Sequence, residues 1–245
     1  MLSNVIHTQA VHEEFGGVVP EIASREHLRL LPGIVREALA EADVAVGDLD
    51  GIVFTRGPGL AGPLLVGAAF ARAMALESGK PLWGANHLEG HLAAVRLSHP
   101  ELSPPFLCLT VSGGHTELTE VQADGTFLAL GSTRDDAAGE AFDKCGKILG
   151  LGYPAGPAIS KEAERGNRKA FPFPVGLRGE GLDFSFSGMK TAVSRQAKES
   201  GERLDEQRAD LCASLQEAIV DALVLKSMRA LQERNLPGIA VCGGV

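Results

Sequence analysis

The 245-residue sequence predicts an α/β protein. In its first part, short apolar segments alternate with helical ones in the order strand, helix, strand, helix, which is typical of an α/β layer. Three apolar segments around Ser112-Gly113-Gly114 then indicate an antiparallel meander. The composition, 44% hydrophobic and 22% charged, is ordinary for a globular domain. No apolar run is long enough to cross a bilayer and no signal peptide follows Met1, so we expect no membrane association and a cytoplasmic location.

A first domain is predicted over residues 1–104. Pro20 suits the first turn of a helix, whereas Pro32-Gly33 predicts a kink or a break in it. Asn86 is a good N-cap for a later helix, and Glu89 stands where a capping box needs a carboxylate. The predicted elements are a helix at 19–42, a strand at 50–55, a helix running to Ser78 after the turn-rich loop 56–62, a strand at 81–84 and a helix after Asn86.

A second domain is predicted over residues 105–245, because Ser103-Pro104-Pro105 separates the two patterns. Its predicted strands are 106–111, 117–121, 126–130 and 238–242, and its predicted helices are 138–150, 155–165, 187–199 and 206–234. Ser187 is the expected cap of the third helix. A strand followed by Gly243-Gly244 normally continues into a turn and a helix, and nothing before Leu2 supplies a first strand. We therefore expect a chain clipped at both ends.

Charge and cysteine content narrow the functional classes. A formal net charge of −8 argues against a broad nucleic-acid-binding surface, so an RNA ligand would need positive charge from a partner. Two small basic clusters are typical of solvated helix faces; they are Arg165, Arg168 and Lys169, and Lys190, Arg195 and Lys198. The cysteines are far apart and fit buried thiols in a reducing compartment better than a disulfide framework or a thiolate zinc site; they are Cys108, Cys145, Cys212 and Cys242.

The most informative segment is Asn86-His87-Leu88-Glu89-Gly90-His91. Residues four apart on a helix share a face, so His87 and His91 can reach one metal ion. Packing or hydrogen bonding explains such a pair equally well. A metalloprotease requires a glutamate directly after the first histidine, and Glu89 is two positions on, which disfavours that class.

Four further segments are candidates for chemistry. Ser112-Gly113-Gly114-His115-Thr116 either binds an anion through successive N–H groups or is an ordinary hairpin turn. Arg56-Gly57-Pro58-Gly59 lacks the spacing and lysine of a P-loop. Tyr153-Pro154-Ala155-Gly156-Pro157 either lets a flat ring approach Gly156 or is a turn before a helix. Asp143 either serves a site or pairs with Lys147.

The order of these motifs identifies a family. Together they closely resemble, over essentially the whole chain, the tRNA N6-adenosine threonylcarbamoyltransferase family, called TsaD in bacteria and once described as an O-sialoglycoprotein endopeptidase. The segments that carry the resemblance are 16–27, 57–60, 86–91, 111–116, 135–144 and 184–191.

The resemblance implies an actin-like, sugar-kinase-like ATPase fold of two RNase-H-like domains around a nucleotide cleft. It implies transfer of a threonylcarbamoyl group from threonylcarbamoyl-AMP to N6 of adenosine-37 in tRNAs that read codons starting with A. The implied partners are tRNA and the bacterial subunits TsaB and TsaE, with TsaC supplying the adenylate. The implied cofactor is one divalent metal ion, Fe²⁺ or Zn²⁺.

Site residues follow from the resemblance position by position. His87 and His91 match the metal ligands, and Asp143 and Gly156 match contacts on the nucleoside side. The substrate-binding turn is matched by Thr110, Val111, Ser112, Gly113 and Gly114, with His115 at its edge. No general base is assigned. The family's third metal ligand, an Asp, and a nucleoside-contacting Asn would follow Val245, and Ala155 stands where many members have Gly. The alternatives are a weakly active or non-catalytic fragment, a scaffold subunit, or an ATPase or kinase of the same fold.

Overall fold

The computed structural model describes residues 1–15, 18–179 and 181–245. The Gly16-Gly17 pair that opens the 16–27 motif lies outside these residues. The chain forms two compact units, Met1–Gly90 and His91–Val245. Within the described ranges, no helix combines the length and hydrophobicity that a membrane span requires.

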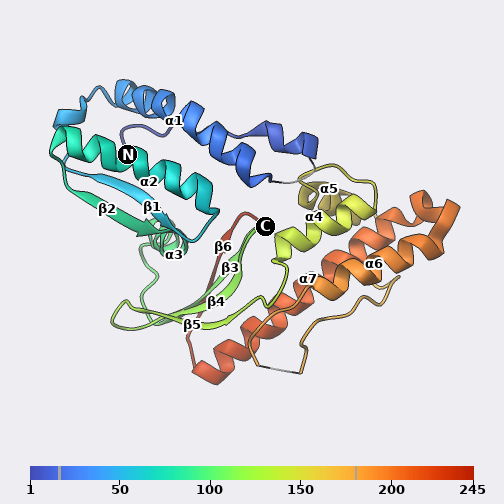
Figure 1. The fold of residues 1–245 in the computed structure, drawn as a ribbon. Coiled ribbons are helices and arrows are strands. Elements are labelled where there is room, and N and C mark those ends of the chain that lie inside the picture. Colours follow the sequence, from blue (N-terminus) through green and yellow to red (C-terminus); the bar gives the residue numbers. More distant parts are fainter. Residues whose placement is uncertain (16–17, 180) are drawn as a thin grey trace. The chain divides into compact units, whose positions relative to one another are not determined.

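The first unit is a small α/β layer. Its elements are η1 (Ala10–Phe15), α1 (Pro20–Ala42), η2 (Val46–Asp48), β1 (Ile52–Gly57), α2 (Ala61–Ser78), β2 (Leu82–Asn86) and the start of α3 (His87–Ser98). Strands β1 and β2 are parallel, with Ile52 opposite Leu82. Helix α2 packs on β1 and α1 packs on α2 (Figure 1). Ile52 is buried against Ala71 and Ala75 of α2, which confirms the predicted β-α-β order.

Helix α1 continues through Pro32, so of the kink or break predicted at Pro32-Gly33 the break does not occur. A proline inside a helix removes the hydrogen bond to the carbonyl four residues earlier, here that of Leu28. The Leu28 side chain is 68% exposed, so this turn of the helix borders solvent and water can satisfy the freed carbonyl.

The second unit contains a mixed sheet with the strand order β5-β4-β3-β6. Its strands are β3 (Phe106–Val111), β4 (Thr116–Val121), β5 (Phe127–Ser132) and β6 (Ile239–Gly243). The predicted meander is confirmed, since β4 is antiparallel to both β3 and β5. Strand β6 is parallel to β3, with Thr110 opposite Cys242.

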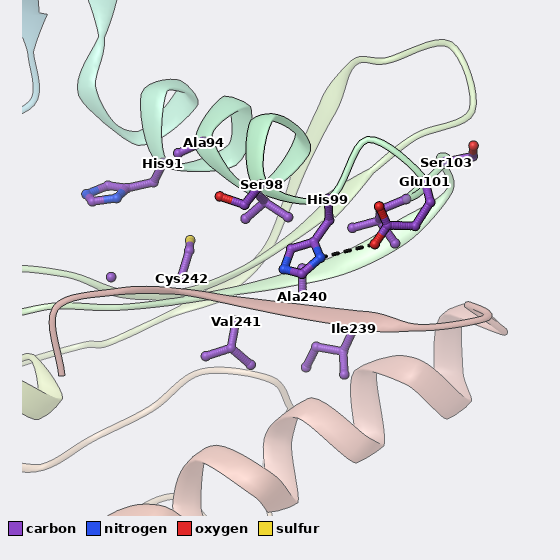
Figure 2. A pocket seen from close by; sticks show the side chains of 13 residues that line it. His91, Ala94, Ser98, His99, Glu101, Ser103, Ile239, Ala240, Val241 and Cys242 are labelled. Atoms are coloured by element: carbon purple, nitrogen blue, oxygen red, sulfur yellow. Dashed lines mark hydrogen bonds and ion pairs between the residues drawn. The ribbon is translucent and has the colours of Figure 1, made fainter.

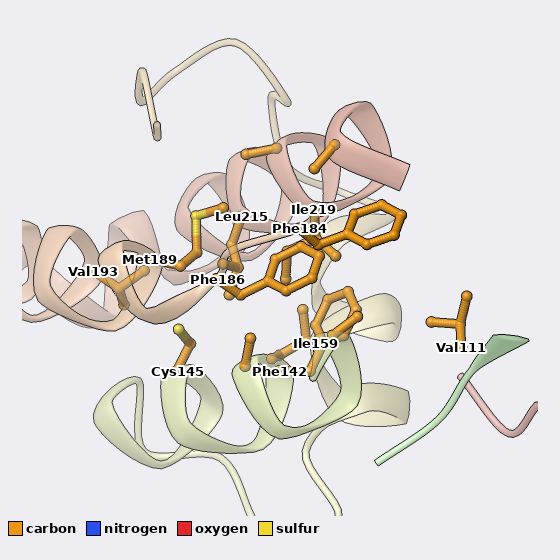
Figure 3. Close-up of a cluster of buried hydrophobic side chains, with 14 of the residues drawn as sticks. Val111, Phe142, Cys145, Ile159, Phe184, Phe186, Met189, Val193, Leu215 and Ile219 are labelled. Atoms are coloured by element: carbon orange, nitrogen blue, oxygen red, sulfur yellow. The ribbon is translucent and has the colours of Figure 1, made fainter. Parts of the chain in front are cut away.

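Helices cover the sheet of the second unit on both faces. On one face, Leu92 and Val95 of α3 pack with Phe106 and Cys108 of β3 and with Val121. On the other face, the alternate β3 residues join a large apolar core formed with helices α4 to α7 (Figure 3). The helices are α4 (Ala138–Ile148), α5 (Gly156–Ala163), α6 (Ser187–Ser200) and α7 (Leu204–Arg234), with η3 (Gly201–Arg203) before α7.

The two units divide at a different place from the predicted boundary at residues 104 and 105. The division falls inside α3, between Gly90 and His91. The reason is the packing of Leu92 and Val95, which bury the rest of α3 against the second sheet. The Pro104-Pro105 segment is therefore a connection within the second unit.

Candidate functional site

The second unit contains a cavity of about 770 Å³ that unites several of the predicted site residues. Its wall takes Val111 and Gly113 from the end of β3, Asp143 from α4 and Gly156 from the start of α5. Cavities of roughly 300–1,000 Å³ with apolar walls and a few polar groups are typical of small-molecule sites. Residues far apart in sequence thus meet at one place.

The turn between β3 and β4 forms one end of this cavity. Val111 pairs with Thr116, so residues 112–115 make a hairpin connection. The Ser112 Oγ accepts hydrogen bonds from the N–H groups of Gly114 at 3.3 Å and His115 at 2.9 Å. The serine hydroxyl thus folds back and satisfies these two N–H groups, which agrees with the hairpin-turn alternative at this segment.

Helix α4 begins directly against this turn. The N–H of Gly139 donates to the Ser112 carbonyl at 3.2 Å, and the N–H of Ala138 donates to Thr116 Oγ1 at 2.9 Å. A Cβ on Gly139 would lie 2.8 Å from Gly113 Cα. Glycine at 139 thus permits α4, which carries Asp143, to approach the turn that carries Gly113.

Asp143 connects α4 to the segment that leads into α5. Its Oδ1 accepts a hydrogen bond of 2.7 Å from the N–H of Ala155, next to Gly156. Tyr153, on the same segment, also lines the cavity. Partial burial and the nearby Asp143 carboxylate raise the pKa of Tyr153, so its hydroxyl remains a hydrogen-bond donor at neutral pH.

Asp135 holds the start of α6 from fifty residues away in the sequence. Its carboxylate accepts hydrogen bonds from the N–H groups of Phe186 at 2.7 Å and Ser187 at 3.1 Å. It also accepts from the hydroxyls of Ser185 at 2.5 Å and Ser187 at 2.8 Å. Burial raises the pKa of Asp135, but the hydrogen bonds from Ser185, Phe186 and Ser187 outweigh it and the net shift is downward.

These contacts correct the predicted cap of α6. Ser187 does not cap α6 but is its first residue and donates to Asp135. The N-cap of α4 is Ala137, and the neighbouring Asp136 accepts from Lys144 Nζ at 2.5 Å. The aromatic residues Phe184 and Phe186 are 1% exposed and belong to the core.

Helix α7 supplies the wall of the cavity that the sequence interpretation missed. Its contribution is a stripe of five residues at helical spacing, namely Gln216, Ile219, Val220, Leu223 and Val224. Val220 and Val224 are 43% and 53% exposed, unlike most apolar residues of a buried helix. The sequence signal for this wall was an apolar face of α7 that is interrupted by the amide of Gln216. Helical periodicity alone does not distinguish such a wall from ordinary core packing.

Thr110 lies on the opposite face of the sheet from this cavity. It is 3% exposed, and its Oγ1 is 3.4 Å from Cys242 Sγ. Successive residues of a strand point to opposite faces, so Val111 reaches the cavity of about 770 Å³ and the Thr110 side chain does not. A second cavity, of about 680 Å³, lies between α3 and β6 and is lined by His91 and Cys242 among others (Figure 2).

The histidine pair begins α3, as predicted. Asn86 Oδ1 accepts hydrogen bonds from the N–H groups of Leu88 at 2.8 Å and Glu89 at 3.4 Å, which confirms it as the cap. His87 and His91 stand one turn apart on this helix. Two imidazoles at that spacing suit two positions of a metal ion's coordination shell. In the described part of the chain, no three His, Cys, Asp or Glu side chains gather closely enough to hold a metal.

The end of β6 completes the cavity of about 770 Å³ through Val241, Gly244 and Val245. Gly243 has a φ of +119°, and a Cβ there would lie 1.9 Å from the Val111 carbonyl oxygen. Only glycine allows the two strand ends to approach so closely. The N–H of Val245 then donates to the same carbonyl at 3.4 Å.

Comparison with known proteins shows the same relationship over the whole chain. Residues 1–245 match the sequence profile of the family described as TsaD, tRNA N6-adenosine threonylcarbamoyltransferase. The protein of that name from Clostridium botulinum (strain 657 / Type Ba4) is 48% identical over 248 residues, covering 100% of this chain and 73% of the relative. The one from Paracidovorax citrulli (strain AAC00-1) is 51% identical over 247 residues, covering 100% and 71%.

Among solved structures, component A of the (R)-2-hydroxyglutaryl-CoA dehydratase of Acidaminococcus fermentans has a similar fold. The TM-score is 0.53 at 14% sequence identity, over 87% of this chain and 68% of that one. This likeness concerns the α/β fold only.

Proposed function

The chain belongs to the tRNA N6-adenosine threonylcarbamoyltransferase family, and we propose that its cavity of about 770 Å³ binds the adenylate end of threonylcarbamoyl-AMP. Because the chain belongs to this family, its function is transfer of a threonylcarbamoyl group to N6 of adenosine in tRNA. We propose in addition that the donor is threonylcarbamoyl-AMP, that the donor sits in this cavity, and that the acceptor is adenosine-37 of tRNAs that read codons starting with A.

The meeting of four positions that the family resemblance assigns to substrate binding carries this proposal. Val111, Gly113, Asp143 and Gly156 come from separate parts of the chain and line the same cavity. Ser112 and Gly114 complete the turn at its end. An adenylate combines a flat apolar base with polar sugar and phosphate groups. The α7 stripe with Phe142 suits the base, while Asp143 and the 112–115 turn suit the polar groups.

The transfer itself requires positioning more than acid or base strength. The N6 amine of adenosine attacks the carbamoyl carbon of the donor, the bond from that carbon to the adenylate phosphate oxygen breaks, AMP leaves with the electron pair, and the amine releases one proton to solvent. AMP is a good leaving group, whereas the amine is a weak nucleophile, so the enzyme must hold the two in line. Asp143, fixed by Ala155 N–H at 2.7 Å, is placed to orient the nucleoside. We assign no general base.

We propose His87 and His91 as ligands of one divalent metal ion. When bound, such an ion supplies Lewis-acid stabilisation of charge on the carbonyl and phosphate. Imidazole ligands suit iron and zinc alike, and the family resemblance favours Fe²⁺. Both rings belong to α3, whose start is fixed by the Asn86 cap. The cap thereby sets which way the first turn of the helix presents the two imidazoles.

We also propose the finer features that the resemblance implies. The two units correspond to the two halves of an actin-like, sugar-kinase-like ATPase fold, with RNase-H-like topology in each. The partner subunits are TsaB and TsaE, with TsaC supplying the adenylate, and the reaction takes place in the cytoplasm. A net charge of −8 favours partners that contribute positive charge for tRNA binding.

Two matched glycine variants test the cavity assignment. A Cβ at either Gly156 or Gly152 would meet no heavy atom within 4 Å, but only Gly156 lines the cavity. We expect Gly156→Leu to fill part of the cavity and to weaken AMP binding at least tenfold by isothermal titration calorimetry. Gly152→Leu should bind AMP like the unmodified chain. Equal AMP affinity in both variants would place the adenylate elsewhere.

A further inference from the structure

The thiol of Cys242 has surroundings unlike those of the other three cysteines. Cys108, Cys145 and Cys212 are all 0% exposed. Burial raises the pKa of Cys145 to about 12 and that of Cys212 to about 11, which keeps both protonated and unreactive. Cys242 is only half-buried and lines the cavity of about 680 Å³. Figure 2 shows its sulfur on the side of β6 that faces α3, while Val241 and Ile239 point the other way.

Two buried groups are within hydrogen-bonding distance of this sulfur. Cys108 Sγ lies 3.6 Å from Cys242 Sγ, and Thr110 Oγ1 lies 3.4 Å from it. Both neighbours are at most 3% exposed, so water does not compete for these contacts. The hydrogen bond from Cys108 lowers the pKa of Cys242, and the contact with Thr110 adds to the effect against the opposing effect of burial. The thiolate is the nucleophilic form of cysteine.

We propose that Cys242 is an oxidation site that reacts with hydrogen peroxide, and that Cys108 resolves the product into a Cys108–Cys242 disulfide. The cavity of about 680 Å³ lets a small oxidant reach the Cys242 sulfur from solvent. The second thiol stands 3.6 Å away and is shielded from solvent, so it is placed to trap the oxidised Cys242 and not to meet the oxidant first.

The chemistry balances without any further reactant. The Cys242 thiolate attacks one peroxide oxygen, the O–O bond breaks, and the departing hydroxide takes up a proton to form water. This leaves a sulfenic acid on Cys242. The hydrogen bond with Cys242 is the main cause, ahead of burial, of the raised pKa of Cys108, and conversion of Cys242 to the sulfenic acid removes the neighbouring thiolate, so the Cys108 thiol can then lose its proton. The Cys108 sulfur attacks the Cys242 sulfur, the S–O bond breaks, and the released hydroxide leaves as a second water with the Cys108 proton. Two thiols are oxidised and one peroxide is reduced to two waters.

The sheet register gives this disulfide a structural consequence. Cys242 stands opposite Thr110, whereas Cys108 stands opposite Ala240, so the two sulfurs belong to diagonal neighbours. Closing their separation from 3.6 Å to about 2 Å therefore displaces β6 along β3. The end of β6 contributes Val241, Gly244 and Val245 to the cavity of about 770 Å³. Oxidation should change the shape of that cavity.

Differential alkylation of the 245-residue chain tests the reactive thiol. The native chain is treated with light N-ethylmaleimide at neutral pH, then unfolded and treated with the heavy form. We expect Cys242 to take the light label on the order of 100 times faster than Cys145 or Cys212, the buried thiols of the same molecule. Similar rates for Cys242 and these internal controls would overturn the proposal.

Peroxide treatment tests the resolving thiol. After oxidation and trypsin digestion, we expect peptide 97–134 linked to peptide 235–245, and reduction with dithiothreitol should release both. The Cys108→Ser variant should instead accumulate a dimedone-trapped sulfenic acid on Cys242, and Cys242→Ser should give neither product. A Cys242 that resists peroxide, or that forms no link to Cys108, would refute the assignment. We also expect oxidation to lower the affinity for AMP tenfold. This last measurement rests on the proposed function, whereas the labelling and peroxide experiments do not.

Discussion

Replacing Asp135 with alanine should weaken the second unit through the start of α6. The carboxylate accepts four hydrogen bonds there, two from backbone N–H groups and two from serine hydroxyls. Ser187 is exposed and Ser185 half-buried, so their hydroxyls can turn to water at little cost. The loss of stability comes from the N–H groups of Phe186 and Ser187, which lose their acceptor, and Phe186 is buried. At about 1 kcal/mol each, these predict a loss of about 2 kcal/mol in the free energy of unfolding.

The assay is urea unfolding followed by two probes. Far-UV circular dichroism reports on all helices and is dominated by α4 to α7 of the second unit, whereas the single tryptophan, Trp83, reports on the first unit alone. We expect Asp135→Ala to move the dichroism midpoint to lower urea and to move the Trp83 fluorescence midpoint less. Asp50→Ala provides a matched control, because it removes an exposed carboxylate of the first unit.

The pH dependence separates the hydrogen bonds from simple packing. The folded-state pKa of Asp135 lies below its unfolded value, so its contribution is fully present above the unfolded pKa and is lost as pH falls through the folded pKa. The stability difference between wild type and Asp135→Asn should therefore be largest near neutral pH and shrink in acid below about pH 4. A difference that is constant with pH, or an unchanged dichroism midpoint in Asp135→Ala, would refute the reasoning.

Three further predictions follow from close contacts. Gly139→Ala puts a Cβ 2.8 Å from the Ser112 carbonyl oxygen, so it should lower the free energy of unfolding by about 1–3 kcal/mol in urea and weaken AMP binding in calorimetry. The control is Gly188→Ala, which is also second in its helix but has open space around it and should change neither quantity. Lys226→Met removes the Nζ that donates to the Leu177 carbonyl at 2.6 Å and to the Gly181 carbonyl at 3.0 Å. Because these contacts hold the loop that contains Arg178, trypsin should cut after Arg178 several-fold faster in the variant. An unchanged cutting rate would show that the Lys226 contacts do not hold this loop. His91→Ala should reduce bound iron or zinc in metal-content analysis of the purified chain, and an unchanged metal content would remove it from the ligand set.

Much of the secondary structure could be predicted from local pattern. The alternating apolar strands and the helical periodicity placed β3, β4 and α4 to α7 within a few residues of their observed ends. The Asn86 cap was visible because its partners are two and three residues away. Helix α1 does not break at Pro32 because a proline costs a helix only one hydrogen bond, which the exposed side of α1 can replace with water.

Long-range contacts could not be predicted in this way. Ser187 is a residue type that often caps helices, but the start of α6 is held by Asp135, which lies in a loop that only the folded sheet places beside α6. The face on which Thr110 lies followed in principle from strand alternation, yet the family resemblance grouped it with Val111. Whether the α7 stripe around Gln216 faced a core or a cavity depended on how closely the neighbouring helices pack.

By itself the sequence determined the family, the α/β class, most element boundaries and the positions of the motif residues, because these depend on local propensity and on order along the chain. Only the tertiary structure decided that Asp143 and Gly113 line one cavity, that α7 contributes to its wall, and that the sulfurs of Cys108 and Cys242 stand 3.6 Å apart despite a separation of 134 positions in the sequence. The physical reason is that such contacts depend on strand register and helix rotation. Both are set by how the whole core packs, and spacing in the sequence does not record them.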